Sequence, residues 1–315
     1  MNNITRLNYL STYISNFFDF FITKNRCAKS PQTYFGKKIM EQNDGSNYIE
    51  KLISYNKPFA IARFGAVECG CFNRGLEIKL GLVKQFKQTN FYQMQNNAGF
   101  FSATNNELLK FTQLQEKCFK EIDLLAVFNI FMEDYIVNHF CKNAKLTTLI
   151  TVDPVLSSWT KSLRGKKVLV VHPLAELIQQ QYKKRELLFE DKDKLPDFHL
   201  KVFPAVQTIA GEKDDRFNSW FEALDYMIDE ISKIEFDIAL IGAGAYGLPL
   251  AVKIKTQLRK QAIHIGGATQ LLFGIRGKRW DIREDFAGYF NEYWVRPDKK
   301  YIPQNAQGVE GGCYW

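Results

Sequence analysis

The sequence predicts an α/β protein with a mostly parallel sheet flanked by helices. Short apolar runs that suit buried strands alternate with segments of helical periodicity, which is the order typical of βαβ units. One run, residues 168–171, is a continuous series of Val and Leu, as in central parallel strands that are covered on both faces. With 315 residues, 46% of them hydrophobic and 24% charged, the chain can bury a sizeable core.

The first predicted element is an N-terminal helix over residues 7–22. Its apolar side chains fall on one broad helical face: Leu7, Leu10, Ile14, Phe17, Phe18 and Phe21. The stretch is too short and too polar to span a bilayer. Two interpretations stay open, a helix packed on the domain and an interfacial helix that contacts a membrane surface. The flanking cations Arg6, Lys24 and Arg26 suit both.

After this helix, residues 27–45 are expected to form an irregular linker. We therefore divide the chain into an N-terminal helix and linker, residues 1–45, and a single domain, residues 46–315. Strands are predicted at 58–64, 122–128, 146–151, 168–171, 200–203, 236–241 and 261–265. Helices are predicted at 48–54, 106–119, 132–141, 157–163, 174–189, 220–231 and 248–259. The segment 289–315 is rich in Tyr and Trp and is expected to pack over the sheet or close the site.

Residues 236–265 predict a strand, a glycine turn, a helix and a second strand. Gly242, Gly244 and Gly247 have the spacing G-x-G-x-x-G, which lets the backbone approach a ligand at a helix start that attracts anions. A dinucleotide site normally has an acidic residue about 20 positions later, yet residues 248–280 contain no Asp or Glu. A phosphorylated ligand is therefore favoured. Arg276 and Arg279 are expected to contact it, whereas the helical lysines are expected to be solvated.

Informative polar residues follow four predicted strands, and ligands of open α/β sheets bind beyond such strand ends. They are Arg63 with Gly65 and Glu68, then His172, then the glycine turn, and finally His264 with Gly266 and Gly267. We expect these strand ends to converge on one crevice.

Several roles stay open for these side chains. Glu68 suits a divalent metal ligand, a general base or a carboxylate that stabilises a helix start. Arg63 suits a phosphate contact or an ion pair with Glu68. His172 and His264 are candidate acid/base groups or hydrogen-bond donors to a phosphate. For each of them, a hydrogen-bonded structural role is the alternative.

The net charge of +8 permits an anionic partner such as a nucleotide-sugar, an acidic polymer or a membrane surface. Nucleic-acid binding is not expected, because no recognised motif accompanies the basic residues. The six cysteines are scattered and form no C-x-x-C pair, so neither a zinc site nor a disulfide framework is predicted. Without a secretory signal pattern, the expected location is the cytoplasm.

The stretch Arg63-Phe64-Gly65-Ala66-Val67-Glu68 resembles the R-F-G-D-G-E element of bacterial glycosyltransferases of the GT-D fold. Further stretches resemble a related group of proteins encoded with bacterial surface-polysaccharide genes: GKKVLVVHP, FDIALIGAGAYGLPLA, AIHIGGATQLLFGIRGKRW, NEYWVRP and VEGGCYW. The likeness covers residues 58–315 and leaves out the N-terminal helix.

This resemblance implies a Rossmann-like, GT-D-like α/β domain that uses a nucleotide-sugar and a divalent cation, Mn²⁺ or Mg²⁺. It carries Glu68 over as the acidic metal and donor residue of a D-x-E motif. The first acid of that motif is Ala66 here, which removes one metal ligand. Either Glu68 works with another acid, or the cationic loop 276–279 replaces the metal, or catalysis has been lost.

We therefore expect a cytoplasmic glycosyltransferase that moves a sugar from a UDP-linked donor to a glycan or lipid-linked glycan in surface-polysaccharide or capsule assembly. Glu68, His172 and His264 are the candidate catalytic residues. The expected donor-binding residues are Arg63, Gly65, Gly242, Gly244, Tyr246, Gly247, Gly266, Gly267, Gln270, Arg276 and Arg279. Two alternatives remain, an NADP-dependent oxidoreductase and a non-catalytic nucleotide-sugar-binding subunit of a glycan-assembly complex.

Overall fold

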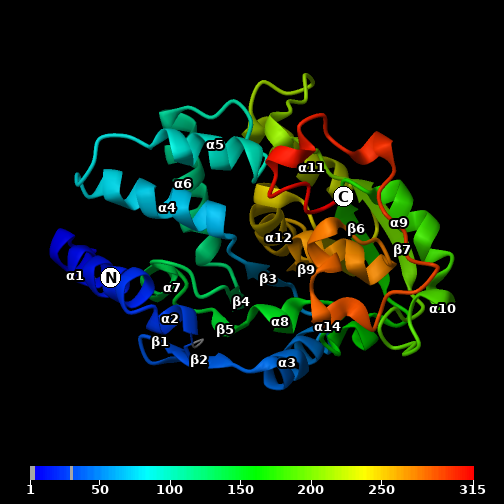
Figure 1. Ribbon diagram of the computed structural model, residues 1–315. Coiled ribbons are helices and arrows are strands. Elements are labelled where there is room, and N and C mark those ends of the chain that lie inside the picture. Colours follow the sequence, from blue (N-terminus) through cyan, green and yellow to red (C-terminus); the bar gives the residue numbers. More distant parts are fainter. Residues whose placement is uncertain (1–3, 29–30) are drawn as a thin grey trace.

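The computed structural model describes residues 4–28 and 31–315 and has the predicted α/β class (Figure 1). In this part of the chain, nine strands form one sheet in the order β1-β2-β5-β4-β3-β9-β8-β6-β7. Neighbouring strands are parallel except for the antiparallel pair β1 and β2. The strands are β1 Thr33–Tyr34, β2 Lys37–Met40, β3 Phe59–Arg63, β4 Leu124–Val127, β5 Lys145–Thr148, β6 Lys167–His172, β7 His199–Pro204, β8 Ile238–Ile241 and β9 Gln261–His264.

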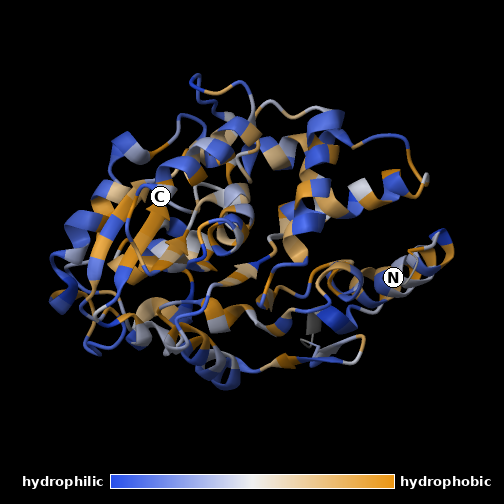
Figure 2. Cartoon of the chain, turned by 180° about the vertical axis from the view of Figure 1, so that it is seen from behind, coloured by the Kyte–Doolittle hydropathy of each residue, from blue (hydrophilic) through white to orange (hydrophobic). Residues whose placement is uncertain are grey.

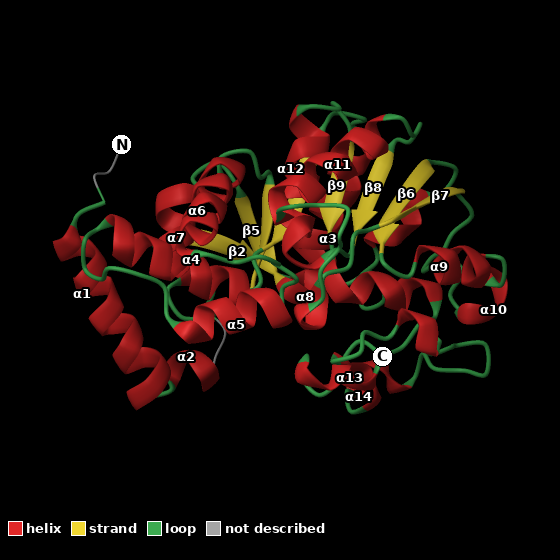
Figure 3. Cartoon of the chain, turned by 90° about the horizontal axis from the view of Figure 1, so that it is seen from above, coloured by secondary structure: helices red, strands yellow, loops and turns green. Residues whose placement is uncertain are grey.

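Helices cover both faces of the sheet, so the strands lie inside (Figure 3). The longer helices are α1 Arg6–Phe17, α3 Gln42–Ser54, α4 Ala66–Lys79, α5 Gln88–Asn96, α6 Asn105–Phe119, α7 Glu133–Phe140, α9 Ala175–Tyr182, α11 Trp220–Ser232 and α12 Gly247–Thr256. The four-residue helices are α2 Asn25–Ala28, α8 Leu149–Val152, α10 Arg185–Leu188, α13 Lys278–Asp281 and α14 Glu284–Ala287. The segment η1, Phe18–Ile22, is a π-helix that continues α1. The 3₁₀-helices are η2 Trp159–Leu163, η3 Ile209–Gly211, η4 Gly244–Tyr246, η5 Gly266–Phe273, η6 Lys299–Tyr301 and η7 Ala306–Gly308.

The central strands are apolar on both faces because helical layers cover both. In β6, Val168 and Val170 pack with α3, α9 and the C-terminal segments, whereas Leu169 and Val171 pack with α11 and α12. The same alternation holds in β8, as the period of two along a strand requires. Figure 2 shows the strands coloured as hydrophobic between more mixed helices.

The predicted linker is more regular than the sequence indicated. Strands β1 and β2 lie within residues 27–45, and Ile39 and Met40 pair with Leu146 and Thr147 of β5. These strands escape a pattern search because they are two and four residues long, and residues 29–30 of the predicted linker lie outside the described residues. The helix predicted over 174–189 divides into α9 and α10. The division of the chain into domains stays a prediction.

A buried carboxyl group fixes the loop between β4 and α7, residues 128–132. Glu133 is fully buried and accepts hydrogen bonds from the backbone amides of Phe128 (3.0 Å), Asn129 (2.7 Å) and Ile130 (3.3 Å). The Tyr34 hydroxyl of β1 donates a further bond of 2.8 Å. The short strand β1 is therefore tied to the sheet through this loop as well as through β2.

Stability is expected to fall as pH rises through the titration of Glu133. Burial raises the pKa of this carboxyl from its usual 4.5 to about 7, against its hydrogen bonds, which lower the pKa. Because the folded pKa is the higher one, its stabilising contribution is complete below about pH 4.5 and is lost as pH rises through 7. The loss is on the order of 3 kcal/mol. Urea unfolding across this pH range measures it, and Glu133→Gln is expected to flatten the profile; an unchanged profile would contradict the assignment.

Candidate functional site

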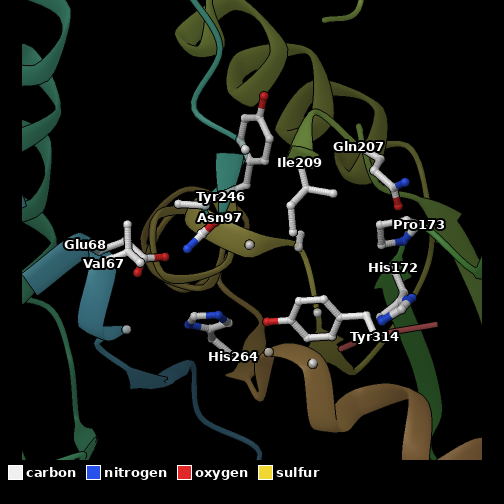
Figure 4. Close-up of a pocket in the computed structure, with 18 of the residues that line it drawn as sticks. Val67, Glu68, Asn97, His172, Pro173, Gln207, Ile209, Tyr246, His264 and Tyr314 are labelled. Carbon is white, nitrogen blue, oxygen red and sulfur yellow. The ribbon is translucent and has the colours of Figure 1, made fainter. Parts of the chain in front are cut away.

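A cavity of about 250 Å³ opens at the carboxyl ends of β3, β9, β8 and β6. All four strand ends that the sequence singled out contribute lining residues. Figure 4 shows Glu68, Asn97 and His264 on one side of the cavity and His172, Pro173 and Gln207 on the other, with Tyr314 between them. The volume lies just below the range of about 300–1,000 Å³ that is usual for ligand pockets.

Arg63, at the end of β3, supplies a positive charge that no carboxylate in the described chain neutralises by an ion pair. Its Nη1 donates to the Ile265 carbonyl oxygen at 3.1 Å, and its guanidinium lies over the Phe128 ring, 4.7 Å from the ring centre. Burial lowers the pKa of the Arg63 guanidinium, while the negative charge of the Glu68 carboxylate raises it. A guanidinium held in this way keeps donors available for an anion.

Glu68 occupies the third position of α4, whose N-cap is Gly65. Its carboxylate folds back over that cap, because a Cβ added at Gly65 would lie 2.3 Å from Oε2. Burial raises the pKa of Glu68, and its own backbone amide and the Arg63 charge lower it. The residue therefore combines the helix-start position with a place in the cavity lining, so the geometry is compatible with its predicted helix-start role and with its predicted role as a general base.

His172 and His264 are buried at the ends of β6 and β9 and are neutral at pH 7. Burial lowers the pKa of both imidazoles to about 3, and the Arg63 charge lowers that of His264 further. The Leu174 amide donates to Nδ1 of His172 at 3.0 Å, so the proton of its neutral ring lies on Nε2. These properties suit hydrogen-bond donors better than proton acceptors.

The glycines of the G-x-G-x-x-G turn allow close packing of protein groups. A Cβ at each position would lie within 3 Å of a neighbour: His172 at Gly242, the Ala98 carbonyl oxygen at Gly244 and His264 at Gly247. Gly244 also has a φ of +51°, which side chains rarely adopt. Several amides of the turn already donate within the protein, among them that of Gly242 to the Val171 carbonyl oxygen and that of Ala245 to the Ala98 carbonyl oxygen. The turn therefore shapes the cavity and positions both histidines.

The C-terminal segment, residues 309–315, closes one side of the cavity, as the sequence predicted for its aromatic end. Gln270 Nε2 donates to the Tyr314 carbonyl oxygen at 3.1 Å, and the Arg279 amide donates to that of Cys313 at 3.0 Å. The Arg279 guanidinium pairs with Glu310 and lies over the Tyr314 ring, 4.8 Å from its centre. Figure 4 shows the Tyr314 hydroxyl directed toward His264.

The replacement Gly277→Ala is expected to loosen this segment. Its Cβ would lie 2.4 Å from the Tyr314 carbonyl carbon, an overlap that costs about 1–3 kcal/mol in unfolding free energy. Carboxypeptidase digestion measures how far the C-terminal segment is loosened, and urea unfolding measures the loss of unfolding free energy. Gly288→Ala is the control, because nothing lies within 4 Å of a Cβ there. Equal digestion rates for the two variants would contradict the predicted closure.

Most of the predicted site residues line the cavity, and two do not. The lining includes Arg63, Gly65, Glu68, His172, Gly242, Gly244, Tyr246, His264, Gly266, Gly267, Gln270 and Arg279. Gly247 lies behind His264, and Arg276 lies outside the cavity with its guanidinium 4.9 Å from the Phe290 ring centre.

Sequence reasoning missed the loops that complete the cavity wall. Asn97 and Gly99 follow α5, and Thr208 follows β7; the Thr208 hydroxyl donates to the Gly99 carbonyl oxygen at 2.5 Å. In the sequence of these loops, the one local pattern is Asn-Asn-Ala-Gly at residues 96–99. This pattern predicts a turn, but it does not indicate that a ligand binds there. Phe128 likewise lacks any motif of its own.

The donor set of the cavity does not fit a divalent cation held by protein ligands. Its carboxylates are Glu68 and Glu310, and Glu310 is paired with Arg279. Over residues 4–28 and 31–315, no three His, Cys, Asp or Glu side chains cluster in a way that would hold a metal. Ala66, where the related motif has an acid, lines the cavity without offering a ligand.

Comparison with known proteins gives one family match. A family model described as "GT-D fold-like domain" matches residues 108–272, which is just over half of the chain. A solved structure described as "The highly conserved domain of unknown function 1792 has a distinct glycosyltransferase fold" aligns with a TM-score of 0.45 and 12% identity, over 82% of this chain and 95% of that one. A selenomethionine-substituted structure of domain of unknown function 1792 aligns with a TM-score of 0.36 and 12% identity, over 80% and 99%. No curated protein matches the sequence.

Proposed function

Because this chain belongs to the GT-D fold-like family, we propose that it is a glycosyltransferase that uses a nucleotide-sugar donor. The fold is that of a glycosyltransferase-like α/β domain. The observation that carries the proposal is Arg63, a guanidinium in the cavity wall with no carboxylate partner for an ion pair among the described residues. A diphosphate is the anion that a nucleotide-sugar would bring to it.

The two arginines of the cavity neutralise the leaving diphosphate in this account. Arg63 provides a positive charge without an ion-pair partner among the described residues. Arg279 provides a second positive charge, which its ion pair with Glu310 neutralises in part. Preorganised cations aimed at developing negative charge are the main electrostatic aid to such a reaction. The residues therefore support donor binding without a protein-bound cation, in place of the Mn²⁺ or Mg²⁺ that the related motif would hold.

Glu68 is the general base in this account. Burial raises the pKa of Glu68, which makes its carboxylate a better proton acceptor than either neutral histidine. It takes the proton of an acceptor hydroxyl, whose oxygen attacks the anomeric carbon of the donor. The bond from that carbon to the diphosphate oxygen breaks, and the nucleoside diphosphate leaves with the electron pair. His172 and His264 donate hydrogen bonds to the bound donor.

The donor is proposed to be UDP-linked and the acceptor to be a glycan or lipid-linked glycan of surface-polysaccharide assembly. The resemblance of residues 58–315 to proteins encoded with such genes supports this assignment. The aromatic ring of Tyr314 beside Arg279 offers a surface on which a sugar ring can stack.

A thermal-shift panel with UDP, GDP, CMP, UDP-sugars and NADPH, each with Mn²⁺ or with EDTA, tests the proposal. A ligand at about 100 times its dissociation constant stabilises the fold by about 2.7 kcal/mol. We expect a shift with UDP or a UDP-sugar that EDTA leaves intact. A shift with NADPH alone would favour the oxidoreductase alternative and overturn the proposal. Binding without turnover of any UDP-sugar would favour the non-catalytic subunit.

A further inference from the structure

The N-terminal segment α1–η1, residues 6–22, attaches to the domain through its polar and aromatic face. The Tyr9 hydroxyl donates to Asn73 Oδ1 at 2.9 Å, and Asn16 Nδ2 donates to Asp134 Oδ1 at 3.0 Å. Arg26, after the segment, forms an ion pair of 2.7 Å with Asp134. These contacts fix the orientation of the helix on the domain.

The opposite face of the same segment is apolar and exposed. Seven of the fourteen large apolar side chains that are exposed in the described chain lie there: Leu7 (77%), Leu10 (41%), Ile14 (56%), Phe17 (42%), Phe18 (53%), Phe21 (55%) and Ile22 (59%). A surface helix normally turns its apolar stripe toward the core. Contiguous exposed apolar surface of this kind marks an interaction site.

We propose that this face lies in the interface of an anionic phospholipid bilayer. A segment rich in Phe, Leu and Ile with flanking cations has the composition of interfacial helices. Arg6 begins the segment and exposed Lys24 follows it, while Asp19 is its one acid. With Arg6 and Lys24 against Asp19, residues 6–24 carry a net charge of +1, and the whole chain carries +8. This charge favours an anionic lipid surface over a second copy of the same chain. No helix of residues 4–28 or 31–315 has the length and hydropathy to cross a bilayer. The proposed contact is an interfacial one.

The segment also lies where a membrane contact would serve the cavity. Figure 3 shows α1 and α2 extending on the side of the sheet toward which the strands point, where the C-terminal segment also lies. The strand ends that line the cavity also lie on this side. If the proposed transferase function holds, a bilayer contact here places a lipid-carried acceptor on the same side of the sheet as the cavity. The membrane contact itself does not depend on that function.

Vesicle flotation of the full chain tests the proposal. Vesicles of phosphatidylcholine with phosphatidylglycerol are expected to bind the protein, and vesicles of phosphatidylcholine alone to bind it more weakly. The double variant Phe18→Ser, Ile22→Ser is expected to lower the partition coefficient at least about tenfold, because two large apolar side chains no longer leave water. Lys24→Glu is expected to weaken binding to the anionic vesicles alone.

The matched control is Tyr55→Ser, Leu187→Ser, which removes two side chains of similar exposure, 54% and 47%, from other elements. Circular dichroism and UDP binding verify that each variant is folded, and they report on the cavity separately from the membrane contact. Absence of binding by the wild-type protein would overturn the proposal. A dimer in sedimentation that the Phe18→Ser, Ile22→Ser variant dissociates, without any vesicle binding, would assign the face to a second copy.

Discussion

Arg63→Met is expected to lower the affinity for a nucleoside diphosphate by about 10- to 100-fold. The substitution keeps an unbranched apolar stem beside Phe128 but removes the cavity cation that has no ion-pair partner in the described chain. Hydrogen bonds from a charged donor to phosphate contribute roughly 1.5–3 kcal/mol each, which corresponds to that range of affinity. Isothermal titration of UDP into the two proteins measures the effect.

Arg276→Met is the matched control for this substitution. Arg276 also lies over an aromatic ring, Phe290, but outside the cavity. Its loss is expected to leave the affinity unchanged within about twofold. Equal losses in both variants would show that overall charge, rather than the position of Arg63, governs binding. Arg63→Lys is expected to fall between wild type and Arg63→Met, because it keeps the charge but loses the guanidinium fork.

Glu68→Gln is expected to reduce turnover by about 10²- to 10⁴-fold, the usual contribution of a general base. The affinity for UDP is expected to change little, because the amide keeps the shape of the carboxyl group. Release of UDP from a saturating UDP-sugar and acceptor measures the rate. The wild-type rate is also expected to rise with pH through the titration of Glu68, whose pKa lies above its usual value. This rise of the rate with pH should be absent from the Glu68→Gln variant.

Glu107→Gln separates catalysis from helix-start stabilisation. Glu107 holds the same third position in α6 that Glu68 holds in α4, but it lies outside the cavity. Both substitutions remove a carboxylate from a helix N-terminus, where such charges contribute roughly 0.3–1 kcal/mol. Glu107→Gln is expected to lose stability, because it also removes the ion pair with Lys110. Glu68→Gln is expected to lose less or none, because burial already disfavours the charged form of Glu68. A similar loss of turnover in Glu107→Gln would show that Glu68 acts only through the fold.

The sequence predicts the sheet and the strand ends well because both depend on local patterns. Continuous apolar runs such as residues 168–171 mark strands that are buried on both faces, and parallel strands bring their carboxyl ends to one edge. Arg63, His172 and His264 could therefore be placed near one another without a structure. The short strand β1 had no comparable pattern, since its place depends on Tyr34 reaching buried Glu133.

The chemistry of the site was harder to predict than its location. The histidines have the right residue type for a base, but their protonation depends on burial that no pattern in the sequence reveals. The glycine turn was expected to approach an anion, which stays a prediction. Gly242 and Gly244 line the cavity, and they also admit the His172 ring and the Ala98 carbonyl oxygen, a packing role that the spacing did not indicate. Tyr314 enters the cavity through backbone contacts with residues far away in the chain, which motif spacing cannot show.

A crystal structure of the UDP complex, grown without divalent cations, tests the central claim most directly. We expect a diphosphate within hydrogen-bond distance of the Arg63 guanidinium, on the cavity side of Arg279 and Tyr314. A diphosphate bound away from Arg63, or UDP that enters the cavity only when Mn²⁺ bridges it to Glu68, would contradict the account.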